Sequence, residues 1–208
     1  HLTTEKELGL FDSKNHREKN ITAEVCVHHL HFNDSSYDDL QQLIVCNPAI
    51  KTENDQKALM EAVNGDLLDI IATDHAPHTI EEKSKTYPDC PSGLPLVQHS
   101  LLLLLDFFHQ GKMSLETIVR KTSHNVAEVY GLKDRGFIRE DYWGDLVLVD
   151  LNATTKVTKD SILYECAWSP FEEQIFNSMI NKTFVNGELI LSEGQILSQP
   201  SGRRLEFV

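Results

Sequence analysis

The chain has 208 residues, of which 40% are hydrophobic and 25% charged, and its formal net charge is −13 at pH 7. This length allows one large domain, or one domain with a smaller one beside it. The acidic excess disfavours nucleic acid and anionic membrane surfaces as partners, and the longest apolar run, LLLLLDFF from Leu101, is broken by Asp106 and too short to span a membrane. The four cysteines are widely spaced, which favours free thiols in a reducing cytoplasm over a disulfide framework.

The first third of the chain predicts two helices with one strand between them. TTEKELGLFDSKN begins with a capping-box pattern, so we expect a helix directly after His1. ITAEVCVHHLHF, residues 21–32, is rich in β-branched side chains and predicts a strand. A turn with a short helix should follow over 33–43, then a loop around Pro48 and a helix over 52–66.

The middle of the chain predicts a second strand and two further helices. LLDIIATDH, residues 67–75, is a continuous apolar run typical of a strand buried in a parallel sheet. The loop over 76–93 is long enough to suggest a functional role. Helices should follow over 94–111 and 114–131. Because strands alternate with helices, we expect a parallel α/β sheet.

After Gly131 the composition changes to short candidate strands with Gly and Asn-Gly turns. These strands are GDLVLVDL, TFVNGELILSEGQI and RRLEFV. We therefore expect a larger α/β unit over residues 1–140 and a small β region over residues 141–208.

Two residues at predicted strand ends could carry metal chemistry. In parallel α/β sheets the reactive groups gather where the strands end. Asp74 lies at such an end, and so does His1 if a strand precedes it. A carboxylate and a neutral imidazole are both zinc ligands, and the carboxylate can also move a proton. An Asp after a strand can equally be a turn former, and a single terminal His says little alone.

Other polar residues are harder to interpret from the pattern alone. Successive side chains of a strand point to opposite faces, so His28 and His29 should not form a ligand pair on one face of the predicted strand. Asn47, directly before Pro48, can be an ordinary turn residue.

Taken together, four segments carry a resemblance to a known family. HLTT, TAEVCVHHL, CNPAIKTENDQKAL and IATDHAPH follow in this order, with 73 positions from His1 to Asp74, and resemble the second half of the dihydroorotases of the amidohydrolase superfamily. WGDLVLVDL and AWSPFEEQIFNSMINKTFVNGELILSEG resemble the C-terminal region of that family, so nearly the whole chain is covered. The resemblance implies the C-terminal part of a (β/α)₈ TIM-type metallohydrolase barrel, strands six to eight, followed by a small β region.

The resemblance also implies roles for individual residues. It implies one or two zinc ions, with His1 as a metal ligand and Asp74 as both metal ligand and catalytic acid/base. His75 has no role in it beyond orienting its neighbours. The residues implied in substrate binding are Asn47, His78, Pro91 and Gly93.

The implied activity is zinc-dependent interconversion of N-carbamoyl-L-aspartate and L-dihydroorotate in de novo pyrimidine biosynthesis. A hydantoinase, dihydropyrimidinase or allantoinase is the nearest alternative, although those rings do not require the carboxylate-binding His78. Another alternative is a metal-free, non-catalytic relative of these enzymes.

The family's other metal ligands lie on earlier strands that have no counterpart in this sequence. We therefore expect the upstream half of the same protein to complete the site. We also expect a small-molecule substrate, a homo-oligomer and a cytoplasmic location.

Overall fold

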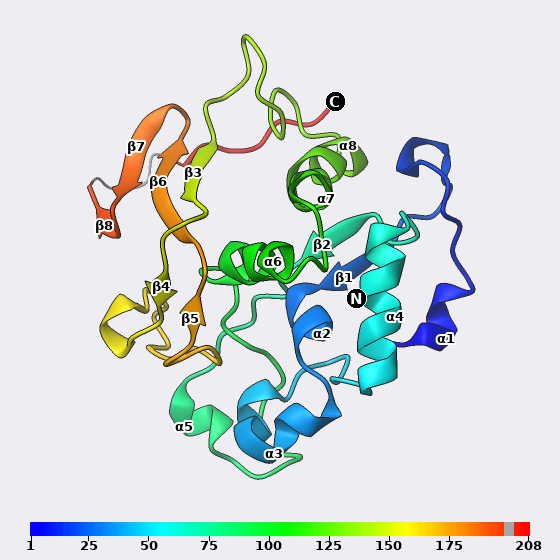
Figure 1. The fold of residues 1–208 in the computed structure, drawn as a ribbon, viewed down its shortest axis with the longest axis vertical. Helices are drawn as coiled ribbons and strands as arrows, with labels where there is room; N and C mark the ends of the chain where they lie inside the picture. Colours follow the sequence, from blue (N-terminus) through cyan, green and yellow to red (C-terminus); the bar gives the residue numbers. More distant parts are fainter. Residues whose placement is uncertain (198–201) are drawn as a thin grey trace.

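A computed structural model of the chain describes residues 1–197 and 202–208, and its centre is a pair of parallel strands (Figure 1). Strand β1 (Glu24–Cys26) pairs with β2 (Ile70–Ala72), and Cys26 lies opposite Ala72. Both strands are largely buried because their side chains are apolar on the face that packs against the helices. The predicted parallel pairing of these two segments is confirmed.

The N-terminus lies beside this strand pair (Figure 1). The backbone N–H of Leu2 donates to the carbonyl oxygen of Glu24 over 3.0 Å, so His1 is held at the edge of β1. Helix α1 (Glu5–Leu8) follows at once, as predicted. Its capping box is complete, because Thr4 accepts from the Glu7 N–H while the Glu7 carboxylate accepts from the Thr4 N–H.

The strand predicted over 21–32 is only partly present. It ends at Cys26, and the chain then turns into the one-and-a-half-turn helix α2 (Val27–His31). His28 and His29 therefore do not alternate across a sheet. Their rings are neighbours, with centroids 4.0 Å apart, so the prediction that they point to opposite faces was wrong.

The remaining helices follow the predicted order. The 33–43 segment forms short helical turns around α3 (Tyr37–Leu40), and α4 (Glu53–Asn64) begins at a second complete capping box, formed by Thr52 and Asp55. The long loop contains the short helix α5 (Ile80–Lys83). Helix α6 (Ser100–His109) is followed by one continuous helical stretch made of α7 (Leu115–Val119), a π-helical turn (Arg120–His124) and α8 (Asn125–Val129).

The C-terminal region contains the expected antiparallel strands. A four-stranded sheet has the order β3-β6-β7-β8, and a separate strand pair joins β4 to β5. RRLEFV was predicted as a strand but makes only a single bridge, from Phe207 to Leu132. The strand bounds are β3 Leu146–Asp150, β4 Thr155–Lys156, β5 Ile175–Phe176, β6 Met179–Val185, β7 Glu188–Ser192 and β8 Gln195–Ile196.

One hydrophobic cluster connects the two regions. Helix α6 lies between the β1–β2 pair and the β4–β5 pair (Figure 1), and its leucines are buried in the same cluster as Val25 and Phe176. A boundary at residues 140 and 141 stays a prediction.

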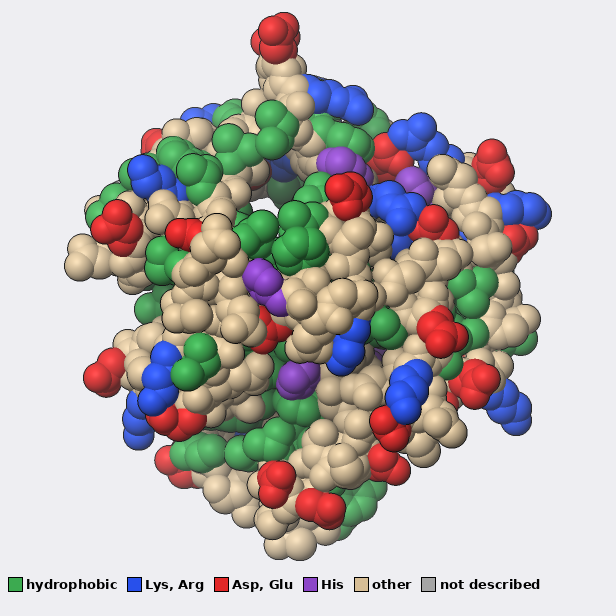
Figure 2. Space-filling model, in the orientation of Figure 1, with side chains coloured by type: hydrophobic (Ala, Val, Ile, Leu, Met, Phe, Trp, Pro, Cys, Tyr) green, Lys and Arg blue, Asp and Glu red, His purple; other side chains and the backbone are tan. Residues whose placement is uncertain are grey.

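The surface is mixed in charge. On the face shown in Figure 2, acidic and basic side chains are interspersed, although acids are in excess over the whole sequence. In the described residues, no helix is long and apolar enough to cross a membrane.

Candidate metal centre and substrate loops

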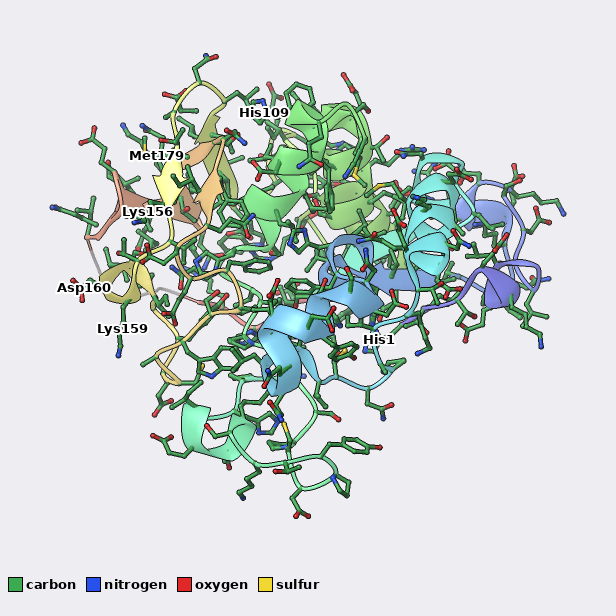
Figure 3. All side chains as sticks on the ribbon, turned by 60° about the horizontal axis from the view of Figure 1, so that its bottom comes forward. His1, His109, Lys156, Lys159, Asp160 and Met179 are labelled. Atoms are coloured by element: carbon green, nitrogen blue, oxygen red, sulfur yellow. The ribbon has the colours of Figure 1, made fainter. Side chains whose placement is uncertain are left out.

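His1 and Asp74 lie together at the ends of neighbouring segments, as predicted from the sequence. The Nε2 atom of His1 is 3.3 Å from Oδ1 of Asp74. The position of His1 in the fold is shown in Figure 3. Asp74 follows β2 by two residues and has a φ of +48°, a left-handed conformation that Asp tolerates better than most residues. That turn directs the chain from the strand into the loop, and both side chains remain partly exposed, at 34% and 27%.

The other nitrogen of His1 faces β1. Its Nδ1 atom lies 2.5 Å from Oε1 of Glu24 and 3.2 Å from the sulfur of Cys26. Glu24 and Cys26 are two residues apart on one strand, so their side chains share a face. Burial, together with the charges of Asp74 and Glu24, raises the pKa of the Cys26 thiol, which therefore stays protonated near neutral pH.

The donor set fits zinc. Imidazole nitrogen and carboxylate oxygen both bind zinc, and across a tetrahedral ion two such ligands are separated by about 3.4 Å. The separation between His1 Nε2 and Asp74 Oδ1 is 3.3 Å. The ligand atoms of His1, Glu24 and Cys26 also lie within 4.8 Å of one another. His1 and Asp74 are thus placed where they could supply two ligands to one metal ion.

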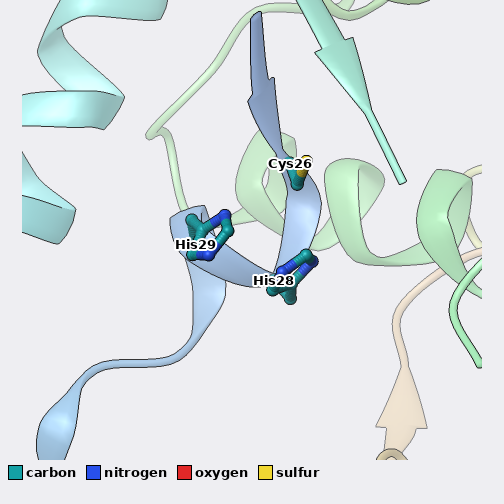
Figure 4. A group of neighbouring side chains, drawn as sticks. All are labelled: Cys26, His28 and His29. Carbon is teal, nitrogen blue, oxygen red and sulfur yellow. The ribbon is translucent and has the colours of Figure 1, made fainter. Parts of the chain in front are cut away.

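A second group shares Cys26 and contains His28 and His29 (Figure 4). Burial lowers the pKa of His28 to about 2 and that of His29 to about 4, so both rings are neutral. The backbone of Thr73 acts in the opposite direction on the pKa of His28. Among the described residues, however, neither ring nitrogen of His28 has a hydrogen-bond partner of normal geometry. Because both rings are buried and neutral, we assign this group to packing.

The loop that carries Asn47 is anchored to helix α2 by hydrogen bonds. His29 Nε2 donates to the carbonyl oxygen of Pro48 over 2.9 Å, and the thiol of Cys46 donates to the same oxygen. Asn47 itself is exposed. Burial is the main cause that raises the pKa of Cys46 to about 11, and the nearby charge of Asp74 adds to it. Asp74 is therefore close enough to this loop to act on it electrostatically.

His78 lies in the loop after β2, where its ring is held on one side. Its Nε2 atom lies 3.1 Å from the carbonyl oxygen of Ser92, and its Nδ1 atom is 3.7 Å from Oε2 of Glu82. Its own carbonyl accepts from the indole N–H of Trp168. The carbonyl of Ser92 can only accept, so Nε2 carries a proton in this arrangement.

The segment with Pro91 and Gly93 is tied to the Asn47 loop through its backbone. Gly93 N–H donates to the carbonyl of Val45 over 2.9 Å, and the buried amine of Lys83 donates to the carbonyls of both Val45 and Pro91 at 3.0 Å. Gly93 has a φ of +138°, and a Cβ there would lie 2.4 Å from the carbonyl oxygen of Ala76. Because the Gly93 N–H already donates to Val45, it is not free to donate to a substrate.

His75 acts on the protein backbone. Its Nδ1 atom accepts from the N–H groups of Leu96 and Val97, and its ring lies against Tyr164. It thereby connects the end of β2 to the segment that leads into α6, in keeping with the orienting role expected for it.

Comparison with known proteins identifies the family. The profile of the amidohydrolase family matches residues 4–190. The chain belongs to the amidohydrolase family. The dihydroorotase of Halobacterium salinarum is 36% identical over 186 residues, which cover 88% of this chain and 43% of that protein. The resemblance to dihydroorotases is thus confirmed, and the chain spans less than half the length of this relative.

Solved structures confirm that this amidohydrolase chain has an α/β fold of the hydantoinase type. The L-hydantoinase of Arthrobacter aurescens superimposes with a TM-score of 0.87 at 21% identity, over 96% of this chain and 45% of that one. The inactive dihydroorotase-like domain of a multifunctional protein from Chaetomium thermophilum has a TM-score of 0.70 at 18% identity, over 97% of this chain and 52% of that domain. The fold alone therefore does not decide the activity.

Sequence reasoning missed three residues of this amidohydrolase site. Glu24 contacts His1, His29 anchors the Asn47 loop, and Lys83 supports two loops. The parity of β1, which puts Glu24 and Cys26 on one face, is the signal that could have indicated Glu24. For Lys83 there was none, because IEEKSK has the composition of an exposed helix.

Proposed function

We propose that the chain is the C-terminal part of the (β/α)₈ barrel of a zinc-dependent dihydroorotase, which interconverts N-carbamoyl-L-aspartate and L-dihydroorotate in pyrimidine biosynthesis. The observation that carries the proposal is the pair of acceptors formed by His1 Nε2 and Asp74 Oδ1, 3.3 Å apart at adjacent strand ends. The named dihydroorotase relatives support this choice of substrate.

His1 and Asp74 would hold the metal, and Asp74 would also move the proton. A bound zinc ion supplies a water nucleophile near neutral pH and polarises the amide carbonyl. In the hydrolytic direction Asp74 accepts the proton of the attacking water. A carbon–oxygen bond forms, the ring carbon–nitrogen bond breaks, and Asp74 returns the proton to the leaving nitrogen.

Asn47 and His78 would hold the substrate carboxylate, while the segment with Pro91 and Gly93 would border the ring. His78 already donates from Nε2 to Ser92, so it can donate to a carboxylate only from Nδ1. A ring that donates from both nitrogens is an imidazolium, which also supplies a positive charge. The Nδ1 side now faces Glu82 at 3.7 Å, a weak contact that an anionic substrate would replace.

The proposal also extends to what surrounds the chain. The upstream half of the same protein would supply the remaining metal ligands and close the barrel, because two parallel strands are too few to form a closed barrel. A cytoplasmic homo-oligomer would suit such an enzyme.

Two other functions can be separated from this one by experiment. A hydantoinase-type enzyme would prefer a ring without the carboxylate, and a non-catalytic relative would bind no zinc. The test is to measure the zinc content of the full-length protein and its turnover of L-dihydroorotate, dihydrouracil and hydantoin. Zinc with a preference for dihydroorotate is expected, whereas a preference for hydantoin or dihydrouracil, or the lack of zinc, would refute the proposal.

A further inference from the structure

We propose that Glu24 is a positioning residue for His1, holding the imidazole by Nδ1 so that Nε2 is presented to the metal. The inference rests on the proposed function, because it assigns His1 as the ligand that Glu24 orients. Glu24 itself would touch neither metal nor substrate.

The backbone fixes the two side chains relative to each other. The Leu2 N–H donates to the Glu24 carbonyl at 3.0 Å, which places His1 directly beside Glu24 on the strand. Side chains two residues apart on a strand share a face, so Glu24 lies on the same face as Cys26 and on the opposite face from Val25. The contact therefore follows from strand geometry rather than from a mobile surface side chain.

The Glu24 carboxylate holds the His1 ring by its Nδ1 side. Oε1 of Glu24 and Nδ1 of His1 are 2.5 Å apart, an ion-pair distance. Because the carboxylate accepts, the proton belongs to Nδ1, which leaves Nε2 as the nitrogen available to a metal. Carboxylate–histidine–zinc arrangements of this kind orient the ring and raise its basicity.

The neighbouring thiol does not replace Glu24. The sulfur of Cys26 is 3.2 Å from the same nitrogen, but a neutral thiol is only a weak donor and a weak acceptor and carries no carboxylate charge. Without Glu24, the Nδ1 proton would lose its strong acceptor. The ring would then be free to place its proton on Nε2, next to Asp74 Oδ1, where it would block the metal position.

The experiment uses full-length protein labelled with ¹⁵N at histidine. NMR reports which nitrogen of His1 is protonated, both metal-free and zinc-loaded, and chelator competition gives the zinc affinity. Glu24→Gln removes the charge at nearly constant shape, and Glu61→Gln, an exposed acid on α4, is the matched control. We expect a protonated Nδ1 in both forms of the parent, a shifted or lost Nδ1 proton signal in Glu24→Gln, and a zinc affinity about 10- to 100-fold weaker in that variant only.

The outcomes separate this inference from the proposed function. If Nδ1 of the parent were unprotonated, or if Glu24→Gln bound zinc as tightly as Glu61→Gln, the role of Glu24 would be refuted while zinc binding and turnover stood. The measurement on the parent requires no variant to fold. A parent that bound no zinc and turned over no dihydroorotate would instead refute the proposed function, and the Nδ1 signal would still decide whether Glu24 orients His1.

Discussion

The imidazole of His29 donates from Nε2 to the carbonyl oxygen of Pro48 over 2.9 Å, and so connects helix α2 to the loop that carries Asn47. His29 is 3% exposed and neutral, with a pKa lowered to about 4 by burial. The loop's position thus depends on a partly buried hydrogen bond next to the exposed Asn47.

His29→Ala should therefore act at two levels. Loss of the donor should lower the free energy of unfolding by about 1–3 kcal/mol, and kcat/KM for dihydroorotate should fall because Asn47 is released. Denaturant unfolding and steady-state kinetics measure the two effects. His29→Gln, which retains an N–H donor, should recover part of each, and equal behaviour of both variants and the parent would contradict the anchoring role.

Asp74→Ala in the full-length protein should remove nearly all activity, because the proposed metal ligand and proton carrier is lost. His1→Ala should lower the zinc content, measured by metal analysis of the purified protein. Asp39→Ala, a change at an exposed acid on α3, is the control. Turnover by Asp74→Ala within about tenfold of the parent, or roughly 1.4 kcal/mol of barrier, would show that the mechanism is wrong.

His78→Ala should lower kcat/KM for dihydroorotate by about 10- to 150-fold, the equivalent of a charge-assisted contact of roughly 1.5–3 kcal/mol. Zinc content should not change. Dihydrouracil lacks the carboxylate, so any activity on it should be nearly unaffected by the substitution. An equal loss on both substrates would mean that His78 does not recognise the carboxylate.

Stability should fall as the pH is lowered through the range of histidine titration. Burial lowers the pKa values of His28 to about 2 and of His29, His31 and His99 to about 4. Below pH 6.5 the unfolded chain therefore binds more protons than the native one, and native stability is lost on acidification. Each ring should contribute a slope of up to about 1.4 kcal/mol per pH unit between roughly pH 6.5 and 4.

Denaturant unfolding at several pH values measures this dependence. His28→Gln should remove one titrating group, and so reduce the pH dependence of the unfolding free energy by up to about 1.4 kcal/mol per pH unit in this range. This holds whatever the substitution does to absolute stability. Equal stability of the parent at pH 7 and pH 5 would show that these rings are not held neutral.

Gly93→Ala should disturb the loop more than a typical glycine substitution. An added Cβ would lie 2.4 Å from the Ala76 carbonyl oxygen, in addition to the strain of a φ of +138°. Gly111→Ala is the matched control, because Gly111 also has a positive φ but no atom near the added Cβ. We expect Gly111→Ala to cost about 1 kcal/mol and Gly93→Ala clearly more, by denaturant unfolding. Equal costs would mean that the close approach to Ala76 is relieved easily.

The sequence predicted those features that depend on local pattern. A capping-box pattern located α1, the helical pattern over 52–66 located α4, and a continuous apolar run located β2. The strand over 21–32 was extended too far because Val27 and its neighbours suit a strand as well as a helix, and only packing against α4 and α6 decides between them.

The site was predictable in its composition but not in its contacts. His1 and Asp74 lie 3.3 Å apart. Their metal and catalytic roles stay predictions, as do the substrate roles of Asn47, His78, Pro91 and Gly93. The Glu24–His1 contact joins residues that no helical or strand period relates. Loop contacts such as those of Lys83 depend on tertiary structure that local patterns do not encode.

Lys83 has a consequence for how such a site can change its specificity. The Lys83 amine donates to the carbonyl oxygens of Val45 and Pro91, and the Gly93 N–H donates to the same Val45 oxygen. The loop around Asn47 and the loop around Gly93 are therefore coupled, so that a displacement of one displaces the other. A substitution that reshapes the Gly93 loop for a different cyclic amide would also displace Asn47, the residue proposed to hold the substrate carboxylate. New ring preferences would then be reached more readily by exchanging both loops with their lysine than by single changes in either one.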